Sequence, residues 1–367
     1  MPSLILHIGT AKTGTKTIQR FLADNRPLLA AQGVVVPDID PTRINHRWLV
    51  FLAQDADKVD AYTLRAGLGG TVEQRHRSRQ RLRDQLEERA ARTPDATWII
   101  SSEHLHSRLG LEDLQRLRQL LEPIFDRIEI LVYLRHPLAT AISSWSTKVK
   151  NGIPSTALMP PQACAAICQQ NIRLRAWQQI FGSDNLNVRR FQASAFVGGE
   201  LLKDFCAACS ITSEAGFSFS GIANQSLSFL AIKVLTHLHS IYADGWSPDP
   251  AVSPSLAAKA SATPSAWHWG ELVRFVASHL DAFPAYLPTR AEHDLYADYY
   301  RESDLWVQQE FFAGRPLWQD GSPTLREDSD PRFRAALSAE EQALAGMLAE
   351  LWRERCQRPA PGGGGES

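Results

Sequence analysis

The first twenty residues of the chain most constrain how it can fold. An apolar run of strand length, residues 4–8, leads into a segment of small, polar and basic residues, 10–17. Apolar side chains then recur at helical spacing at Ile18, Phe21 and Leu22. A loop that ends at a helix N-terminus directs several backbone N–H groups, and the positive end of the helix dipole, at one point. This order predicts a strand, an anion-binding loop and a helix.

The loop matches the Walker A pattern of ATP-binding proteins only in part. Gly9 and Gly14 have the Walker spacing, but Thr15 stands where G-x-x-x-x-G-K-[ST] requires a lysine. Lys16 comes one residue later, and Lys12 lies inside the loop. An ATP-using loop needs its Ser or Thr directly after the lysine to hold magnesium. The sequence therefore predicts an anion site that is poorly suited to ATP hydrolysis.

A second motif that suits a phosphate follows another strand-like run. Residues 128–134 are strongly β-prone, and Arg135-His136-Pro137 follows them directly. A helical stretch, 138–149, comes next, and its preceding proline suits the first turn of a helix. Arginine presents a planar fork that bonds phosphate oxygens bidentately, and Ser143, two helical turns on, can add a hydroxyl. The two motifs together predict a two-ended grip on one ligand.

In these two motifs the chain resembles the sulfotransferases that use 3'-phosphoadenosine 5'-phosphosulfate (PAPS), in their bacterial style. Lys12-Thr13-Gly14-Thr15-Lys16-Thr17 fits their 5'-phosphosulfate loop, K-x-G-T-x-[ST], and Arg135 with Ser143 fits their 3'-phosphate motif. The resemblance covers residues from about 3 to 210. It implies PAPS as the cofactor, adenosine 3',5'-bisphosphate as the product and no required metal. It also implies that Lys12 stabilises the negative charge that grows on the 5'-phosphate oxygen during transfer.

Two neighbouring residues compete as the base that deprotonates an acceptor hydroxyl. Residues 98–100 read as a buried strand that ends in polar residues, 101–106. Ligands gather outside the carboxyl ends of strands in open α/β sheets, so we expect this polar segment to face the same cleft as Lys12. Glu103 lies nearest the catalytic histidine position of the cytosolic sulfotransferases, whereas His104 titrates near neutrality. Strand side chains alternate between faces, so one of the two should aim at the acceptor, and we favour Glu103.

Three further features are candidates for contact with the acceptor. His46 follows a predicted strand at residues 34–36, and Lys148 follows the 3'-phosphate motif. The highly charged helix predicted at residues 73–92 carries arginines at positions 75, 77, 79, 81 and 83. Such a helix is either a solvated face balanced by its glutamates or an arm that contacts an anionic acceptor. The resemblance implies a hydroxyl acceptor, for which we favour a carbohydrate or glycolipid.

Composition limits the partners and the location. The formal net charge is only -1, which argues against general nucleic-acid binding. No stretch approaches the twenty apolar residues of a membrane helix, and the N-terminus lacks the pattern of a signal peptide. We therefore expect no transmembrane segment and a cytoplasmic protein. The oligomeric state stays open.

The expected fold is α/β and P-loop-NTPase-like. It is a three-layer sandwich around a central parallel sheet of about four to five strands, with a largely helical C-terminal extension. We expect residues 1–210 to form the PAPS-binding core and residues 211–357 to complete the acceptor cleft. Residues 248–264 are expected to form a mobile loop or lid, and residues 358–367 a disordered tail.

Two other classes of function stay open. One is a P-loop kinase that uses ATP with magnesium, which the displaced lysine and the lack of a clear magnesium-binding aspartate at a strand end disfavour. The other is a non-catalytic nucleotide-binding protein, which would keep the phosphate motifs but would not need Glu103 or His104.

Overall fold

The computed structural model describes residues 1–39, 44–212, 215–219, 226–242, 246–247, 267–318 and 324–357. The chain divides into two compact units. The first comprises residues 1–137, 165–223 and 297–322, and the second comprises residues 138–164, 224–296 and 323–367. Part of the expected core, residues 138–164, thus belongs to the second unit. The expected lid at residues 248–264 and the expected tail at 358–367 lie outside the described residues.

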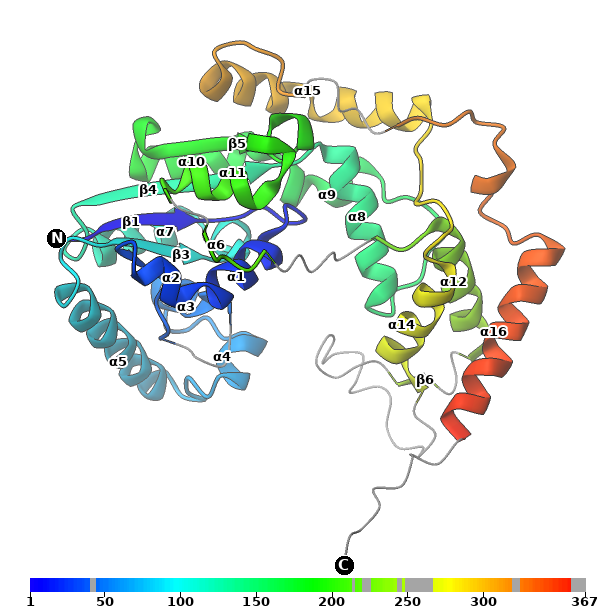
Figure 1. Ribbon diagram of the computed structural model, residues 1–367, viewed down its shortest axis with the longest axis horizontal. Helices are drawn as coiled ribbons and strands as arrows, with labels where there is room; N and C mark the ends of the chain where they lie inside the picture. The colour runs from blue at the N-terminus through cyan, green and yellow to red at the C-terminus, as the bar shows by residue number, and fades with distance from the viewer. Residues whose placement is uncertain are drawn as a thin grey trace, which may run out of the picture. The chain divides into compact units, whose positions relative to one another are not determined.

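A five-stranded parallel sheet forms the centre of the first unit (Figure 1). Its strands are β1 (Ser3–His7), β2 (Val34–Val35), β3 (Thr97–Ser101), β4 (Arg127–Leu134) and β5 (Leu186–Arg190). They lie in the order β2-β3-β1-β4-β5, so the first strand of the chain is the middle strand of the sheet. Leu6 of β1 lies opposite Ile100 of β3 and Ile130 of β4. The expected parallel sheet of four to five strands is confirmed.

Helices cover both faces of this sheet. The helices of the first unit are α1 (Thr15–Asp24), α2 (Arg26–Ala30), α3 (Arg47–Ala53), α4 (Ala61–Arg65), α5 (Val72–Ala91), α6 (Glu103–Arg108), α7 (Leu111–Leu121), α10 (Gln170–Phe181) and α11 (Leu201–Ala208). Leu6 packs into a core with α3, α5, α6, α7 and α10, whereas its neighbour Ile5 packs with α1, α2 and α11. Strands that are apolar on both sides are typical of parallel sheets buried between helices. The three-layer sandwich is confirmed.

The second unit is built almost entirely of helices around its own core. Its elements are α12 (Phe229–Tyr242), α14 (Trp269–Leu280) and α16 (Ala339–Gln357), with most of α8 (Pro137–Lys150), half of α9 (Pro161–Cys168) and the start of α15 (Arg290–Phe312). One short strand pair joins β6 (Trp246–Ser247) to β7 (Trp267–His268). Trp145 is buried in this core, 5.1 Å from Tyr286 and 5.8 Å from Phe229 between ring centroids. The expected helical C-terminal region is confirmed.

The remaining elements are short 3-10 turns: η1 (Ser183–Asn185), η2 (Ala193–Ala195), η3 (Val197–Gly199) and η5 (Pro331–Phe333). In the described part of the chain, no helix combines the length and the apolarity that crossing a membrane requires.

Candidate functional site

The loop after β1 lies where the strand order of the sheet reverses. From β1 the chain builds β2 and β3 on one side and then β4 and β5 on the other. The backbone N–H of Ser102 bonds to the carbonyl of His7, and the N–H of Ile8 bonds to the carbonyl of Leu131, both at 3.0 Å. The ends of β3 and β4 therefore border the start of this loop. Ligands of open α/β sheets bind at such a switch point.

Three residues with positive φ shape this loop. Gly9 has φ 44°, Lys12 has φ 69° and Gly14 has φ 70°. A positive φ is uncommon for a lysine, so the contacts around Lys12 must hold it there. Gly14 is the N-cap residue of α1, and its carbonyl accepts the N–H groups of Thr17 and Ile18. The expected strand, loop and helix are present in that order.

Two threonine hydroxyls fasten the loop to the sheet and to itself. Thr10 Oγ1 donates to the carbonyl of Tyr133 in β4, and Thr13 Oγ1 donates to the carbonyl of Thr10, both at 2.8 Å. Both threonines are buried. Thr13 thus has a structural role inside the loop through its side chain.

Thr15 presents a buried hydroxyl that has no hydrogen-bond partner among the described residues. Gly9 lies against it, since a Cβ on Gly9 would come within 2.6 Å of Thr15 Oγ1. A buried polar group without a partner costs free energy. An oxygen of a bound phosphate or sulfate would satisfy this hydroxyl, so the loop fits an anionic group.

Arg135 connects the second motif to the first. Its Nη1 donates to the carbonyl of Lys12 at 2.9 Å, and its guanidinium carbon lies 5.4 Å from the ring centroid of Phe191. Burial lowers the pKa of Arg135, although arginine keeps its charge in proteins. Two motifs 123 residues apart therefore meet beyond the carboxyl ends of β1 and β4.

Glu103 lies beside the loop at the start of a helix. β3 ends at Ser101 and α6 begins at Glu103, so the strand alternation expected for Glu103 and His104 was wrong. Adjacent helical residues point about 100° apart instead. Gln19 Nε2, from α1, donates to Glu103 Oε2 at 3.0 Å, and a Cβ on Gly9 would lie 3.5 Å from Glu103 Cα. The carboxylate is thereby held next to the loop after β1.

His104 lies between two arginines. Arg47 Nη1 is 3.2 Å from its Nε2, and Arg108 Nε is 3.4 Å from its Nδ1. Both arginines pair with Asp60. Burial, together with the nearby guanidiniums and despite the Glu103 carboxylate, lowers the pKa of His104 to about 4. The imidazole is therefore neutral at pH 7, and it lacks the advantage as a base that a histidine usually has near neutrality.

Two other histidines near the sheet turn inward. His46 is buried, where its Nδ1 accepts the N–H of Ser101 at 2.8 Å and its Nε2 donates to the carbonyl of Pro37 at 3.1 Å. Burial lowers the pKa of His46 to about 4. His46 therefore ties backbone segments together, which differs from the acceptor contact expected from the sequence. His106 is also buried and its Nε2 lies 3.0 Å from Gln170 Oε1, so the segment 101–106 does not face one cleft throughout.

The other predicted site residues lie on two helices. Lys16 is exposed and Thr17 is half-buried in the first turn of α1. Ser143 is half-buried and Lys148 is exposed on α8, in the second unit. A role for Ser143 at the 3'-phosphate, and for Lys148 at the acceptor, stays a prediction.

Four residues of the site were missed from the sequence: Gln19, Arg47, Asp60 and Arg108. Gln19 follows Thr15 by one helical turn, and Arg108 follows His104 by one turn, a spacing that places side chains together on a helix. The one-turn spacing of these two pairs could therefore have identified Gln19 and Arg108 from the sequence. The contacts of Arg47 and Asp60 join segments that only the fold brings together.

Comparison with known proteins gives little. No family model matches the chain, and no curated protein matches it. A solved structure, described as "Crystal Structure of Sulfotransferase from Alicyclobacillus acidocaldarius", is 14% identical over 66% of this chain and 92% of that chain, with a TM-score of 0.36.

Proposed function

We propose that this chain is a PAPS-dependent sulfotransferase that sulfates a hydroxyl of its acceptor. The observation that supports it most is the bond from Arg135 to the Lys12 carbonyl. It joins an anion-binding loop, whose lysine is displaced from the Walker position, to a second phosphate-type motif at the switch point of the sheet. ATP has one polyphosphate chain, whereas PAPS carries phosphate at both ends of its ribose.

The residues of the loop fit an anionic cofactor. The Thr15 hydroxyl is buried and has no partner among the residues that the structure describes, and Gly9 and Gly14 leave the loop free of side chains at two bends. We propose that residues 12–17 hold the 5'-phosphosulfate and that Arg135, with Ser143, holds the 3'-phosphate. PAPS would supply the sulfuryl group. Lys12 would offset negative charge at the leaving oxygen through its ammonium group.

Glu103 would take the proton of the acceptor hydroxyl on a carboxylate oxygen. Gln19 holds Oε2, so this side chain is oriented before the acceptor arrives. A carboxylate can act as a general base when it is positioned within hydrogen-bond reach of the proton. We propose a carbohydrate or glycolipid acceptor, and the cytoplasm, where PAPS is made, as the place of reaction.

Titration calorimetry tests this proposal directly. Adenosine 3',5'-bisphosphate and ATP are titrated into the full chain, each with and without magnesium. We expect the bisphosphate to bind tightly without metal and Arg135→Gln to weaken it by at least tenfold, because a bidentate charged contact is lost. ATP binding that requires magnesium, with no binding of the bisphosphate, would refute the proposal.

Lys12→Ala separates catalysis from binding. We expect it to lose sulfuryl transfer in the presence of PAPS and candidate acceptors, while bisphosphate binding persists in weaker form. Full transfer by this variant would remove Lys12 from the mechanism.

A further inference from the structure

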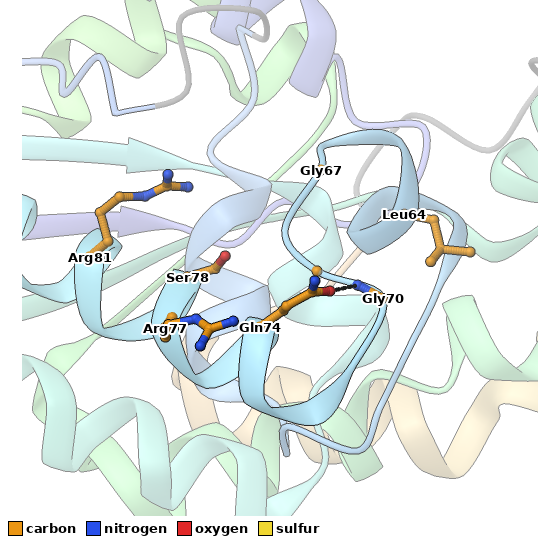
Figure 2. Close-up of a pocket in the computed structure, with 8 residues that line it drawn as sticks. Leu64, Gly67, Gly70, Gln74, Arg77, Ser78 and Arg81 are labelled. Atoms are coloured by element: carbon orange, nitrogen blue, oxygen red, sulfur yellow. Dashed lines mark hydrogen bonds between the residues drawn. The ribbon is translucent and has the colours of Figure 1, made fainter.

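A basic pocket of about 530 Å³ lies in the first unit, between α5 and the glycine-rich loop that precedes it (Figure 2). One wall is the loop from Gly67 to Gly70 with Leu64 of α4. The other wall is α5, which contributes Gln74, Arg77, Ser78 and Arg81. These four positions are spaced by three, one and three residues, so they form one stripe along the helix.

Arg77 and Arg81 differ from the other arginines of this helix. In the described part of the chain, neither guanidinium takes part in a hydrogen bond or a salt bridge. Hydrogen bonds at the start of the helix, and to a smaller extent the charge of Arg77, lower the pKa of the Glu73 carboxyl. Arg79 instead bonds to backbone carbonyls, and Arg83 pairs with Glu87. The stripe therefore carries two cationic groups that remain available, about 6 Å apart along the helix axis.

The backbone at the start of α5 is already satisfied. Gln74 Oε1 accepts the N–H groups of Gly70 and Thr71, and Thr71 Oγ1 accepts the N–H of Gln74, forming a capping box. The helix N-terminus therefore has these donors occupied. Binding in this pocket depends on side-chain donors: the two guanidiniums, the Ser78 hydroxyl and the amide nitrogen of Gln74.

The glycine-rich wall lies directly against the helix. Gly69 has φ 121°, and a Cβ there would come within 2.6 Å of Gln74 Cβ and 2.8 Å of the backbone nitrogen of Arg75. Gly67 also has positive φ, but a Cβ there would meet nothing within 4 Å. The loop thus packs tightly against α5 at Gly69 and leaves open space at Gly67.

The pocket is linked to the candidate base through α4. Asp60, the N-cap residue of α4, pairs with Arg47 and Arg108, which flank His104 beside Glu103. α4 has five residues, about 7.5 Å of helix. Leu64 and Gly67, at and just after its other end, line the pocket. Arginines thus lie near both ends of α4: Arg47 and Arg108 at its start, and the arginines of the pocket near its end.

We infer that the stripe Gln74–Arg77–Ser78–Arg81 binds an acidic saccharide, a ligand that alternates carboxylate or sulfate groups with hydroxyls. Two guanidiniums take the anionic groups, and the hydroxyl and amide between and beside them take the sugar hydroxyls. An oligophosphate would meet the charges and could also accept from the two neutral donors, but its ionised oxygens have no proton to donate to the Ser78 hydroxyl, whereas a sugar hydroxyl can donate to it. The assignment of this saccharide as the sulfate acceptor rests on the proposed function, whereas its binding does not.

Calorimetric titrations of the full chain test the site with defined probes. These are tetragalacturonate and a chondroitin sulfate tetrasaccharide as acidic saccharides, maltotetraose as a neutral one, and tripolyphosphate as an anion without hydroxyls. We expect at least one acidic saccharide to bind and maltotetraose not to bind. Arg77→Gln/Arg81→Gln should weaken that binding about tenfold, the scale expected for two exposed ion pairs.

Arg83→Gln is the control, since it removes one guanidinium by the same kind of substitution from another face of the same helix. It should change saccharide binding less than twofold. An equal loss in both variants, no binding of either acidic saccharide, or equally tight binding of tripolyphosphate would overturn the inference. Glutamine keeps helix propensity, and circular dichroism checks that each variant folds.

The same preparations are titrated with adenosine 3',5'-bisphosphate. Bisphosphate binding should be unchanged in Arg77→Gln/Arg81→Gln. Loss of saccharide binding with bisphosphate binding intact therefore isolates the pocket. A wild-type chain that binds the saccharide but not the bisphosphate would overturn the proposed function and leave the pocket standing.

Discussion

At the scale of single residues, Glu103 and His104 show how neighbours in sequence acquire different chemistry. Glu103 accepts one amide hydrogen bond from Gln19 beside the loop after β1. His104 faces guanidinium groups at both ring nitrogens, and its pKa falls to about 4. A histidine is usually the better base near neutrality, but here its surroundings remove that advantage.

Substitution of each candidate base separates the two. Glu103→Gln keeps the size of the side chain and should lower the rate of sulfuryl transfer by about 10²–10⁴-fold, the usual contribution of a general base. His104→Gln should lower it less than tenfold. Initial rates with PAPS and an identified acceptor measure both, and bisphosphate binding serves as the control for folding. A larger loss in His104→Gln would reassign the base.

Gly14 meets two requirements, a positive φ and close packing against neighbouring side chains, and substitutions at Gly14 and Gly33 distinguish them. Gly14→Ala places a Cβ 2.4 Å from Leu201 and 3.2 Å from Phe191 at φ 70°. Gly33→Ala meets nothing within 4 Å at φ 74°, so it controls for the backbone strain alone. A left-handed backbone costs a non-glycine residue about 1 kcal/mol. We expect Gly14→Ala to lower the melting temperature further than Gly33→Ala and, unlike it, to weaken bisphosphate binding. Equal effects would show that packing at Gly14 is unimportant.

At the scale of elements, a buried carboxylate ties β4, β5 and α11 together. Asp204 of α11 accepts hydrogen bonds from Tyr133 of β4, at 2.8 Å, and from Arg189 of β5, at 2.8 and 2.6 Å. Burial alone would raise the pKa of Asp204, but these hydrogen bonds outweigh it and lower the pKa. Tyr133 also accepts the Thr10 hydroxyl through its carbonyl, so this cluster supports the loop from behind.

Removal of this carboxylate should be costly. Asp204→Ala leaves the Arg189 charge and the Tyr133 hydroxyl without their partner, and we expect a loss of about 3–5 kcal/mol in the free energy of unfolding. Glu200→Ala, which breaks the exposed pair with Lys203 next to the same helix, should cost less than about 1 kcal/mol. Urea denaturation measures both. Similar losses in the two variants would contradict a structural role for Asp204.

At the scale of the whole molecule, the first unit buries several neutral histidines around its sheet. Burial lowers the pKa of His7 to about 3, and the pKa values of His46 and His106 to about 4. The unfolded chain protonates these groups near pH 6.5, whereas the folded chain does not. The unfolded state thus binds more protons between about pH 6.5 and 4, so stability rises with pH across that window.

We therefore expect the first unit to lose stability as the pH falls from 7 to 5. One pKa unit corresponds to about 1.4 kcal/mol, so each buried histidine contributes up to about 2 kcal/mol over this range. Amide hydrogen exchange of β1 and β3 at pH 5, 6 and 7 reports the change. His46→Asn should flatten the dependence, and the exposed His76→Asn should not. A stability that is independent of pH would contradict the burial of these histidines.

Much of the fold could be predicted because local patterns specify it. The apolar runs predicted the strands β1, β2, β3 and β4, and the helices at 73–92 and 138–149 lie within two residues of α5 and α8. The start of α6 was missed because a polar segment after a strand reads equally as extended chain or as helix. His46 was misplaced because its partners, Ser101 and Pro37, are backbone groups whose approach no residue pattern encodes.

Local patterns alone specify that a glycine-containing loop follows one strand and that Arg135 follows another, because an apolar run needs burial and a tight loop favours glycine at its bends. That these two strands are neighbours depends on long-range packing, which no local pattern specifies. In the order β2-β3-β1-β4-β5, β1 lies between β3 and β4, which brings Arg135 to the Lys12 carbonyl and Glu103 to Gly9. Packing also determines which guanidiniums can reach a ligand. Arg79 donates to a backbone carbonyl, whereas Arg77, two residues away on the same helix, lines the pocket.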